Sequence, residues 1–274
     1  MRRALGFKLR DAGQRLLEFV TFMEQRRAPY ITIPLALAWA TQCSGVHDDA
    51  WAAQRLSVVR LFARYRSATD PRSQIPPAGL LPFRAKRARP YLYSDHEIKQ
   101  LLRATLNMPL SARHRKRCEL LPWVYYCLFG LLAVSGLRLG EARNLKPQDL
   151  DLQAQVLTIR GAKLGKDRLV PLHASTCKVL AEYLIRRERH WAGRPVSSYL
   201  FVSSWGNRLD NGQIHRAFYA VSRRIGLRGA ADRHGPRLHD LRHRFATATL
   251  ERVPRTRVCR RYTMVPDQFT RANA

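Results

Sequence analysis

Apolar residues recur every three or four positions through the first part of the chain, which is the spacing of one face of an α-helix. This pattern predicts helices over about residues 10–25 and 33–42. Thr32 directly precedes the second of these helices and suits an N-cap. A third helix is predicted after Asp48, because apolar residues continue at helical spacing as far as Tyr65.

The alternation typical of a β-strand is missing from residues 1–75, so the pattern predicts a small helical bundle there. A bundle that only packs, without a ligand, is one interpretation of this part of the chain. Residues 76–90 then break the periodicity with prolines, Gly79 and a series of basic side chains. This composition predicts a basic linker that can lie along a phosphate backbone.

Residues 91–250 carry the pattern of a second domain. Ser94 is followed three positions later by Glu97, the signature of a capping box, and predicts a helix through Leu102. Residues 120–133 are almost wholly apolar, which predicts a buried core helix. Two more helices are predicted over residues 176–189 and 211–225.

The period of the pattern changes to two over residues 156–160 and 168–172, which predicts two β-strands. The turn between them, residues 161–167, carries Lys163 and Lys166 and makes the two strands a hairpin. The predicted fold class is therefore mainly α with a small antiparallel β-sheet, arranged as a helical N-terminal domain and a larger second domain.

Charge narrows the class of partner. The 274 residues include 49 Lys and Arg against 20 Asp and Glu, so the net charge is +29. The basic residues are spread along the chain instead of forming one tail, and 46% of residues are hydrophobic, which is enough for a real core. This imbalance predicts a polyanionic partner, above all double-stranded DNA.

The five cysteines are odd in number, scattered and without the C-x-x-C spacing, which argues against a zinc site or a disulfide framework. No apolar run reaches the roughly 18 residues of a membrane span. The first ten residues lack the apolar core of a signal peptide. We therefore expect a cytoplasmic protein in a reducing compartment, without a metal ion or a membrane partner.

Residues 135–145 contain a predicted phosphate contact. Gly136 suits the left-handed turn that ends the preceding helix. Arg138 is expected in the first turn of the next helix, where free backbone N–H groups already favour an anion. Glu141 lies three positions on and can hold the guanidinium in place. An ordinary amphipathic helix with a surface ion pair is the alternative interpretation of this stretch.

His239 and Arg242 are three positions apart, and His243 is four positions from His239, so a helix would present all of them on one face. An imidazole beside a guanidinium suits phosphoryl chemistry, because Arg neutralises developing charge and His moves a proton. A solvated basic helix is the alternative. A metal site built on His239 and His243 lacks a clear third ligand.

Three motifs together, in this order along the chain, resemble the tyrosine recombinases, also called the phage integrase family. The motifs are Gly136-Leu137-Arg138 with Glu141, the hairpin that carries Lys163 before Arg168-Leu169-Val170-Pro171-Leu172, and His239-Asp240-Leu241-Arg242-His243. The resemblance covers about residues 10–250. It identifies residues 1–75 as a core-binding, DNA-binding domain, residues 76–90 as the linker and residues 91–250 as the catalytic domain.

The resemblance implies a site-specific DNA recombinase or integrase of a mobile element or phage, which breaks and rejoins DNA through a 3′-phosphotyrosine without a metal or other cofactor. Arg138 and Arg242 would clamp the scissile phosphate. Lys163 would protonate the 5′-hydroxyl leaving group, and His239 would assist as an acid or base. Glu141 and His243 would support these groups. An intact protein of this kind is expected to act as a homo-tetramer on paired DNA sites.

The segment 251–274 departs from the family pattern. No glycine follows Gly235, so the Gly-His box expected there is missing. Tyr262 is the one tyrosine after Arg242, and it follows 20 residues later instead of about thirty. Prolines and arginines interrupt any helical stripe here. We expect an aberrant, poorly ordered tail from a truncated or frame-shifted gene, with Tyr262 as the remaining candidate nucleophile.

Two other functions stay open at this point. The chain could be a non-catalytic DNA-binding remnant or regulator, which the tail favours and which a DNA-cleavage assay would separate from an enzyme. It could also be a helix-turn-helix regulator without catalytic ancestry, but such a protein would not need Arg138, Lys163 and Arg242 together.

Overall fold

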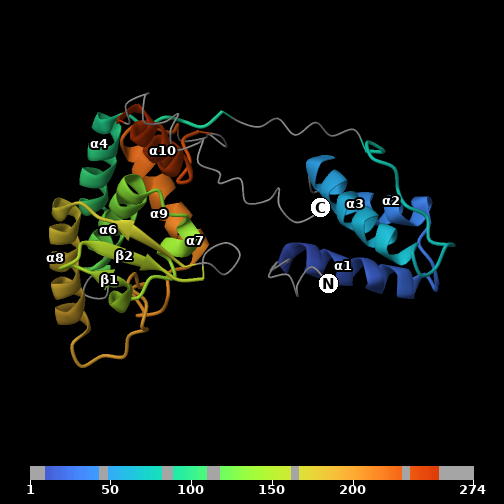
Figure 1. The fold of residues 1–274 in the computed structure, drawn as a ribbon, viewed down its shortest axis with the longest axis horizontal. Helices are drawn as coiled ribbons and strands as arrows, with labels where there is room; N and C mark the ends of the chain where they lie inside the picture. The colour runs from blue at the N-terminus through green and yellow to red at the C-terminus, as the bar shows by residue number, and fades with distance from the viewer. Residues whose placement is uncertain are drawn as a thin grey trace, which may run out of the picture. The chain divides into compact units, whose positions relative to one another are not determined.

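The computed structural model describes residues 10–42, 49–81, 89–109, 118–161, 167–229 and 235–252. The chain divides into two compact units, Met1–Ala88 and Arg89–Ala274, each with its own hydrophobic core. Figure 1 shows the first unit as helices alone and the second as helices around a small sheet. Within the described residues, no helix is both long enough and apolar enough to cross a membrane.

The first unit is built from α1 (Arg10–Gln25), α2 (Ile33–Thr41) and α3 (Asp49–Arg66), which pack against one another in pairs. The predicted cap is present, since Thr32 Oγ1 accepts a hydrogen bond from Leu35 N at 3.4 Å. All three helices confirm the sequence pattern. Phe19, Trp39 and Leu56 bring one large side chain from each helix into the core.

A buried arginine joins two of these helices. The Arg55 side chain on α3 is held between two indole rings, with its guanidinium carbon 3.7 Å from the centre of Trp39 and 4.3 Å from that of Trp51. Arg55 Nη2 also donates to the Trp39 carbonyl at 2.9 Å. Cation–π contact and a hydrogen bond therefore offset the cost of burying this charge.

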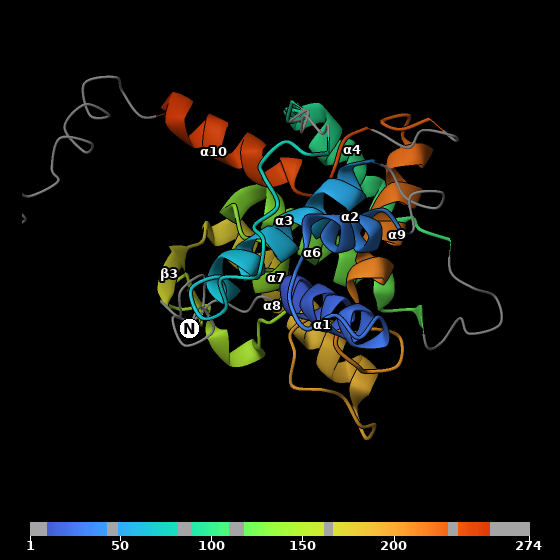
Figure 2. The same cartoon turned by 90° about the vertical axis from the view of Figure 1, so that its right-hand side faces the viewer.

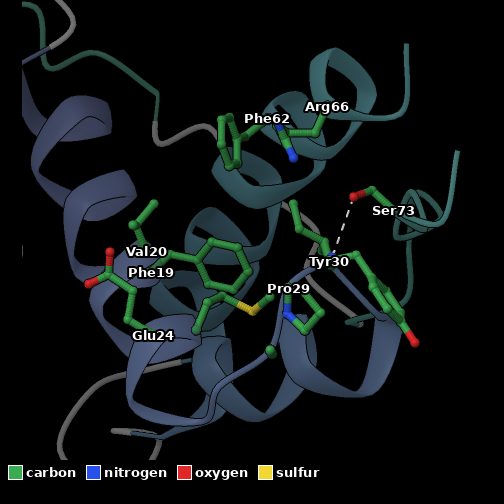
Figure 3. Close-up of a pocket in the computed structure, with 11 residues that line it drawn as sticks. Phe19, Val20, Glu24, Pro29, Tyr30, Phe62, Arg66 and Ser73 are labelled. Carbon is green, nitrogen blue, oxygen red and sulfur yellow. Dashed lines mark hydrogen bonds between the residues drawn. The ribbon is translucent and has the colours of Figure 1, made fainter. Parts of the chain in front are cut away.

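Figure 3 shows a small cavity of the first unit, of about 200 Å³, between α1, α3 and the connection from α1 to α2. Phe19 and Val20 line it from α1, and Phe62 lines it from α3. One side is closed by a hydrogen bond of 3.4 Å from Ile31 N to the hydroxyl oxygen of Ser73. The lining is mostly apolar and contains none of the predicted site residues, so the cavity is a gap in helix packing.

The second unit carries the predicted site residues. In chain order its elements are α4 (Asp95–Leu106), α6 (Leu121–Ser135), α7 (Leu139–Ala142), the 3₁₀ turn η2 (Pro147–Asp149), β1 (Leu150–Asp151), β2 (Val156–Ile159), β3 (Arg168–Pro171), α8 (Ala174–Trp191), α9 (Asn211–Arg224) and α10 (Asp240–Arg252). In Figure 1, α8 lies on one side of this unit and α7 on the other. The predicted mainly α fold with a small antiparallel sheet is confirmed.

Helix α6 is the centre of the second unit. It packs against α4, α7, α8 and α10, and most of its side chains are buried, including Val124, Leu128 and Phe129. This agrees with the prediction of a buried core helix over residues 120–133. The capping box of α4 is also present, because Ser94 Oγ accepts from Glu97 N at 3.2 Å and Glu97 Oε2 accepts from Ser94 N at 2.7 Å.

The sheet has three antiparallel strands in the order β1-β2-β3. Strands β2 and β3 form the predicted hairpin, and Ile159 pairs with Arg168 at the end nearest the turn. The two-residue strand β1 was not predicted, because two positions are too few to show an alternation. The register places Arg168 at the first position of β3, where the chain leaves the hairpin turn.

Two predicted helix starts are wrong by a small but important amount. Helix α7 has only four residues, and Arg138 precedes it as an extended N-cap residue. No helix could run past Leu145 here, because Pro147 favours the extended conformation that Lys146 adopts. Helix α10 begins at Asp240, so His239 lies in the preceding turn and not within the helix as predicted.

The first turns of α10 pack on α6, whereas its last turns project beyond the other helices of the second unit, as Figure 2 shows. Leu250 accordingly remains 55% exposed. The end of α10 that carries Arg242 is therefore the packed end.

Candidate phosphate-binding site

Gly136 joins the two motifs that carry the predicted arginines. It ends α6 in the left-handed conformation, with φ 60° and ψ 22°, as the sequence predicted. Its carbonyl oxygen accepts a hydrogen bond from Nη1 of Arg242. A β-carbon at position 136 would overlap the ring of Phe245. The glycine therefore lets α10 lie directly against the end of α6 and brings Arg242 close to the turn that carries Arg138.

Glu141 is the shared acceptor of two arginines. Its Oε1 accepts from Arg138 Nη1 at 2.9 Å and from Arg168 Nη1 at 3.0 Å. Its Oε2 accepts from Arg138 N at 2.8 Å and from Arg168 Nη2 at 2.8 Å. The Glu141 side chain is only 10% exposed. The carboxylate is thus fully hydrogen-bonded and fixes the turn before α7.

These contacts keep Glu141 ionised. Burial alone would raise the pKa of this carboxyl, but hydrogen bonds from Arg168 and Arg138 outweigh burial and lower the pKa of Glu141 to about 2. Within the described part of the chain the Arg138 guanidinium pairs with Glu141 alone, and 45% of the Arg138 side chain is exposed. The guanidinium is therefore oriented by Glu141 and still accessible to a ligand.

Arg242 completes a cluster of positive charge. Burial lowers its pKa, and repulsion from Arg138 and Arg168 lowers it further, against an opposing effect of Glu141. Arginine remains protonated under these conditions. Three guanidinium groups with one carboxylate between them leave an excess of positive charge, and such a cluster is stabilised by an anion with several oxygen acceptors, such as a phosphate.

His239 and His243 lie beside Arg242. Their ring centroids are 4.9 Å apart and the rings are nearly perpendicular. Burial, together with the nearby His243 and Arg242, lowers the pKa of His239 below its usual value of 6.5. The ring is therefore neutral at pH 7 and can accept or donate a proton. His239 as a whole residue remains exposed, so this burial is only partial, and His243 is half-buried.

A second carboxylate fixes the turn that carries His239. Asp240 is buried and accepts from Arg237 N and from Arg237 Nη2, each at 2.9 Å. The Tyr93 hydroxyl donates to the Arg237 carbonyl at 3.1 Å. These contacts, none of which the sequence pattern had indicated, start α10 at Asp240 and leave His239 in the turn before it.

The described residues thus bring Arg138, Glu141, Arg242, His239 and His243 into one region of the second unit. Lys163 and Tyr262 lie outside the described residues, as does residue 253 onward of the tail for which the sequence predicted poor order. The first two residues of that predicted tail, Glu251 and Arg252, instead end α10. Among the described residues, no group of three or more His, Cys, Asp or Glu side chains could hold a metal ion.

Arg168 is a member of the cluster that sequence reasoning missed. It was assigned only to the second predicted strand, where its neighbours Leu169 and Val170 gave the stronger signal. Its partner Glu141 lies 27 positions away. The one hint in the sequence was a charged residue at the exact start of a strand, which is too common to indicate an ion pair.

Comparison with known proteins identifies the family. The model described as the phage integrase family matches residues 93–262, which is more than half of the chain. The chain belongs to this family. The matched range includes the cluster around Arg138 and Arg242 and ends at the position of Tyr262.

A curated relative agrees with this membership, and two solved structures share the fold. The chain is 64% identical over 252 residues to y4rB of Sinorhizobium fredii, named as an integrase/recombinase, and the alignment covers 92% of this chain and 79% of that protein. The Tn1549 transposon integrase in complex with transposon right end DNA has the same fold, with a TM-score of 0.59, 14% identity and coverage of 93% and 86%. A lambda integrase tetramer bound to a Holliday junction has a TM-score of 0.57, 18% identity and coverage of 89% and 69%.

Proposed function

We propose that this chain binds double-stranded DNA and holds one backbone phosphate between Arg138 and Arg242, as a site-specific recombinase or integrase of a mobile element or phage does. The observation that carries the proposal is the meeting of these two arginines, 104 positions apart in sequence, at the Gly136 turn. The net charge of +29 supports a long contact with DNA around this point.

The residues divide the chemistry of phosphoryl transfer among them. The two guanidinium groups would neutralise the charge that develops on the phosphoryl oxygens in the pentacoordinate transition state. His239, neutral at pH 7, would carry a proton or donate a hydrogen bond to one of those oxygens. Lys163 would protonate the departing 5′-hydroxyl. Each of these roles uses side chains alone, without a metal ion or other cofactor.

Binding is tested by its dependence on salt. Each phosphate that the protein neutralises should contribute about −0.9 to the slope of log affinity against log salt concentration. Fluorescence anisotropy with a labelled duplex should therefore give a steep slope. Replacing Arg84, Lys86 and Arg87 in the linker by Gln should make this slope less steep. A slope near zero for the native protein would contradict the proposed long contact with DNA.

The covalent step is the finer part of the proposal. We propose that the chain binds DNA but forms no phosphotyrosine through Tyr262, because this residue is only 20 positions beyond Arg242 and lies between Pro254 and Pro266. The proposal competes with the family match, which extends to Tyr262. A chain that binds without cleaving would act as a non-catalytic occupant or regulator of recombination sites.

A nicked duplex decides between the two forms of the proposal. The preferred site is first selected from a random-sequence duplex library, and its cleavage position is then tested with nicked suicide substrates on a denaturing gel. No covalent band is expected. A band that is lost in Tyr262→Phe would identify Tyr262 as the nucleophile and restore the complete enzyme.

We also propose assembly as a homo-tetramer on paired DNA sites. The fold shared with the lambda integrase tetramer supports it. Light scattering of the protein on a four-way junction carrying the selected site should give four protomers per junction. Protomers that bind separate duplexes one by one, and that do not associate with one another on the junction, would contradict tetramer assembly.

A further inference from the structure

Arg168 connects the β2–β3 hairpin to the turn that carries Arg138. It is the first residue of β3, and its guanidinium donates two parallel hydrogen bonds of 3.0 and 2.8 Å to the Glu141 carboxylate. This fork-to-fork geometry is the strongest arrangement available to an Arg–carboxylate pair. The Arg168 side chain is 36% exposed, so most of it is in contact with protein.

The carboxylate is shared evenly between the two arginines. Arg138 reaches Oε1 with its side chain and Oε2 with its backbone N–H, and Arg168 reaches both oxygens with its side chain. Among the described residues, the Arg138 guanidinium hydrogen-bonds through Nη1 alone. Its Nε–H and Nη2–H groups therefore have no partner in that part of the chain and suit a ligand.

Charge gives Arg168 a second effect. A pair of Arg138 and Glu141 alone would have no net charge, so the residue that orients the arginine would also cancel its attraction for an anion. With Arg168 present, one carboxylate serves two guanidinium groups and a positive charge remains. Its field also reaches Arg242, whose pKa is lowered by burial, Arg138 and Arg168.

We propose that Arg168 is a positioning residue of the phosphate site: it holds the Glu141 carboxylate that orients Arg138 and leaves the site positively charged. This inference rests on the proposed phosphate site at Arg138 and Arg242. The Arg168–Glu141 ion pair also ties the β2–β3 hairpin to the turn before α7. Arg168 pairs with Ile159, and these two residues flank the turn that contains Lys163 in the sequence. A local change at Arg168 therefore acts on both motifs at once.

The test uses sulfate as the probe, because its two negative charges stay constant between pH 4 and pH 8. Binding is followed by NMR at the Nε–H signal of Arg138 in the full chain. Arg168→Met should weaken sulfate binding at this signal about tenfold, and Arg168→Lys should recover part of the loss by restoring charge without the fork. Amide spectra of the variants report whether the fold is kept.

Arg160→Met is the matched control. Arg160 follows β2 on the same hairpin and pairs with Asp149 at 2.8 Å, outside the Glu141 cluster. The Arg160→Met substitution removes one arginine and one Arg–carboxylate pair, as Arg168→Met does. Its sulfate affinity at the Arg138 signal should stay within about twofold of native.

Acid pH supplies a readout that a purely structural role would not change. Glu141 is faced by Arg138, Arg168 and Arg242, with His239 and His243 beside Arg242. In the native protein its pKa of about 2 keeps it charged down to pH 4. In Arg168→Met the Glu141 carboxyl should begin to protonate between pH 6 and pH 4, which removes a negative charge from the site. The sulfate affinity of this variant should therefore rise more steeply over that range than the affinity of the native protein or of Arg160→Met. All three proteins contain the same histidines, so histidine protonation does not account for the difference.

The outcomes separate the two proposals. If native Arg138 responds to sulfate and Arg168→Met binds equally well with an unchanged pH profile, the positioning role is overturned while the phosphate site stands. If native Arg138 shows no saturable response, the phosphate site itself fails and the role of Arg168 fails with it. If Arg168→Met loses its amide spectrum, Arg168→Lys decides the question, because native-like affinity in that variant would contradict a need for the fork.

Discussion

The guanidinium of Arg242 donates a hydrogen bond to the carbonyl oxygen of Gly136, the residue that ends α6. Carbonyl groups at the end of a helix lack partners within the helix, and this one is satisfied by a side chain from α10. The contact connects the two arginine motifs through the backbone. The position of Arg242 therefore depends on the conformation of Gly136 as much as on α10.

Gly136→Ala should destabilise the second unit by about 3 kcal/mol. The left-handed conformation costs a residue with a β-carbon roughly 1–2 kcal/mol, and displacing the Phe245 ring adds to this. Urea unfolding followed by circular dichroism measures the change.

Gly161→Ala is the control for this substitution. Gly161 also has a positive φ, of 56°, but a β-carbon there would meet no atom of the described residues within 4 Å. It should cost only about 1 kcal/mol, from the backbone conformation alone. Equal losses in the two variants would contradict the close packing of Phe245 on Gly136.

Glu141→Gln should change the dependence of stability on acid pH. The folded pKa of Glu141, about 2, is below its ordinary value of 4.5, so its contribution is complete above about pH 5 and is lost as pH falls toward 2. The variant should lose on the order of 2 kcal/mol at pH 7, a figure reduced for the exposure of its arginine partners, and little at pH 2.

Unfolding at pH 7 and at pH 2 measures this difference. Glu182→Gln removes an exposed carboxylate that pairs with Arg186 at 2.8 Å and should change stability by less than about 0.5 kcal/mol at either pH. A loss in Glu141→Gln that is the same at both pH values would show that Glu141 acts through packing and not through its charge.

His239 should titrate below pH 6.5, because burial, His243 and Arg242 all disfavour its protonated form. NMR of the ring Cε1–H signal measures the pKa directly. His243→Asn should raise it. The signal of His190 on α8, whose pKa is lowered by burial and by Arg194, should not respond to that substitution. An unshifted His239 in both proteins would remove the case for a neutral imidazole at the site.

Arg242→Lys should weaken DNA binding about tenfold while leaving the salt slope unchanged, because lysine keeps the charge but cannot make a two-pronged contact. Arg242→Gln should also reduce the magnitude of the slope by about one. Arg186→Gln changes a residue of α8, which lies across the second unit from α7 in Figure 1, and serves as the control. Its DNA affinity should be closer to the native affinity than that of either Arg242 variant. Anisotropy titrations at several salt concentrations measure all three.

Sequence reasoning succeeded where the signal is local. The apolar run of α6 and its terminal Gly136 predicted a buried helix and its left-handed end, and Ser94 with Glu97 predicted the start of α4. The helical spacing of Leu139, Ala142 and Leu145 predicts a longer helix than α7, whereas Pro147 restricts Lys146 and limits any helix here to residues before it.

The remaining features depend on tertiary geometry. Arg168 meets Glu141 only because the hairpin register brings the first residue of β3 to the turn before α7. Tyr93 reaches the Arg237 carbonyl across 144 positions of sequence. Spacing along one element cannot predict such contacts, because they are set by how two elements lie against each other.

The two separate cores have a consequence for how the chain melts. Each unit has its own tryptophans, with Trp39 and Trp51 in the first and Trp123, Trp191 and Trp205 in the second. Unfolding can therefore proceed as two transitions, for which a single melting temperature has no defined meaning. Fluorescence from one set of indoles would follow its own unit, so that Gly136→Ala would move one transition and leave the other where it was.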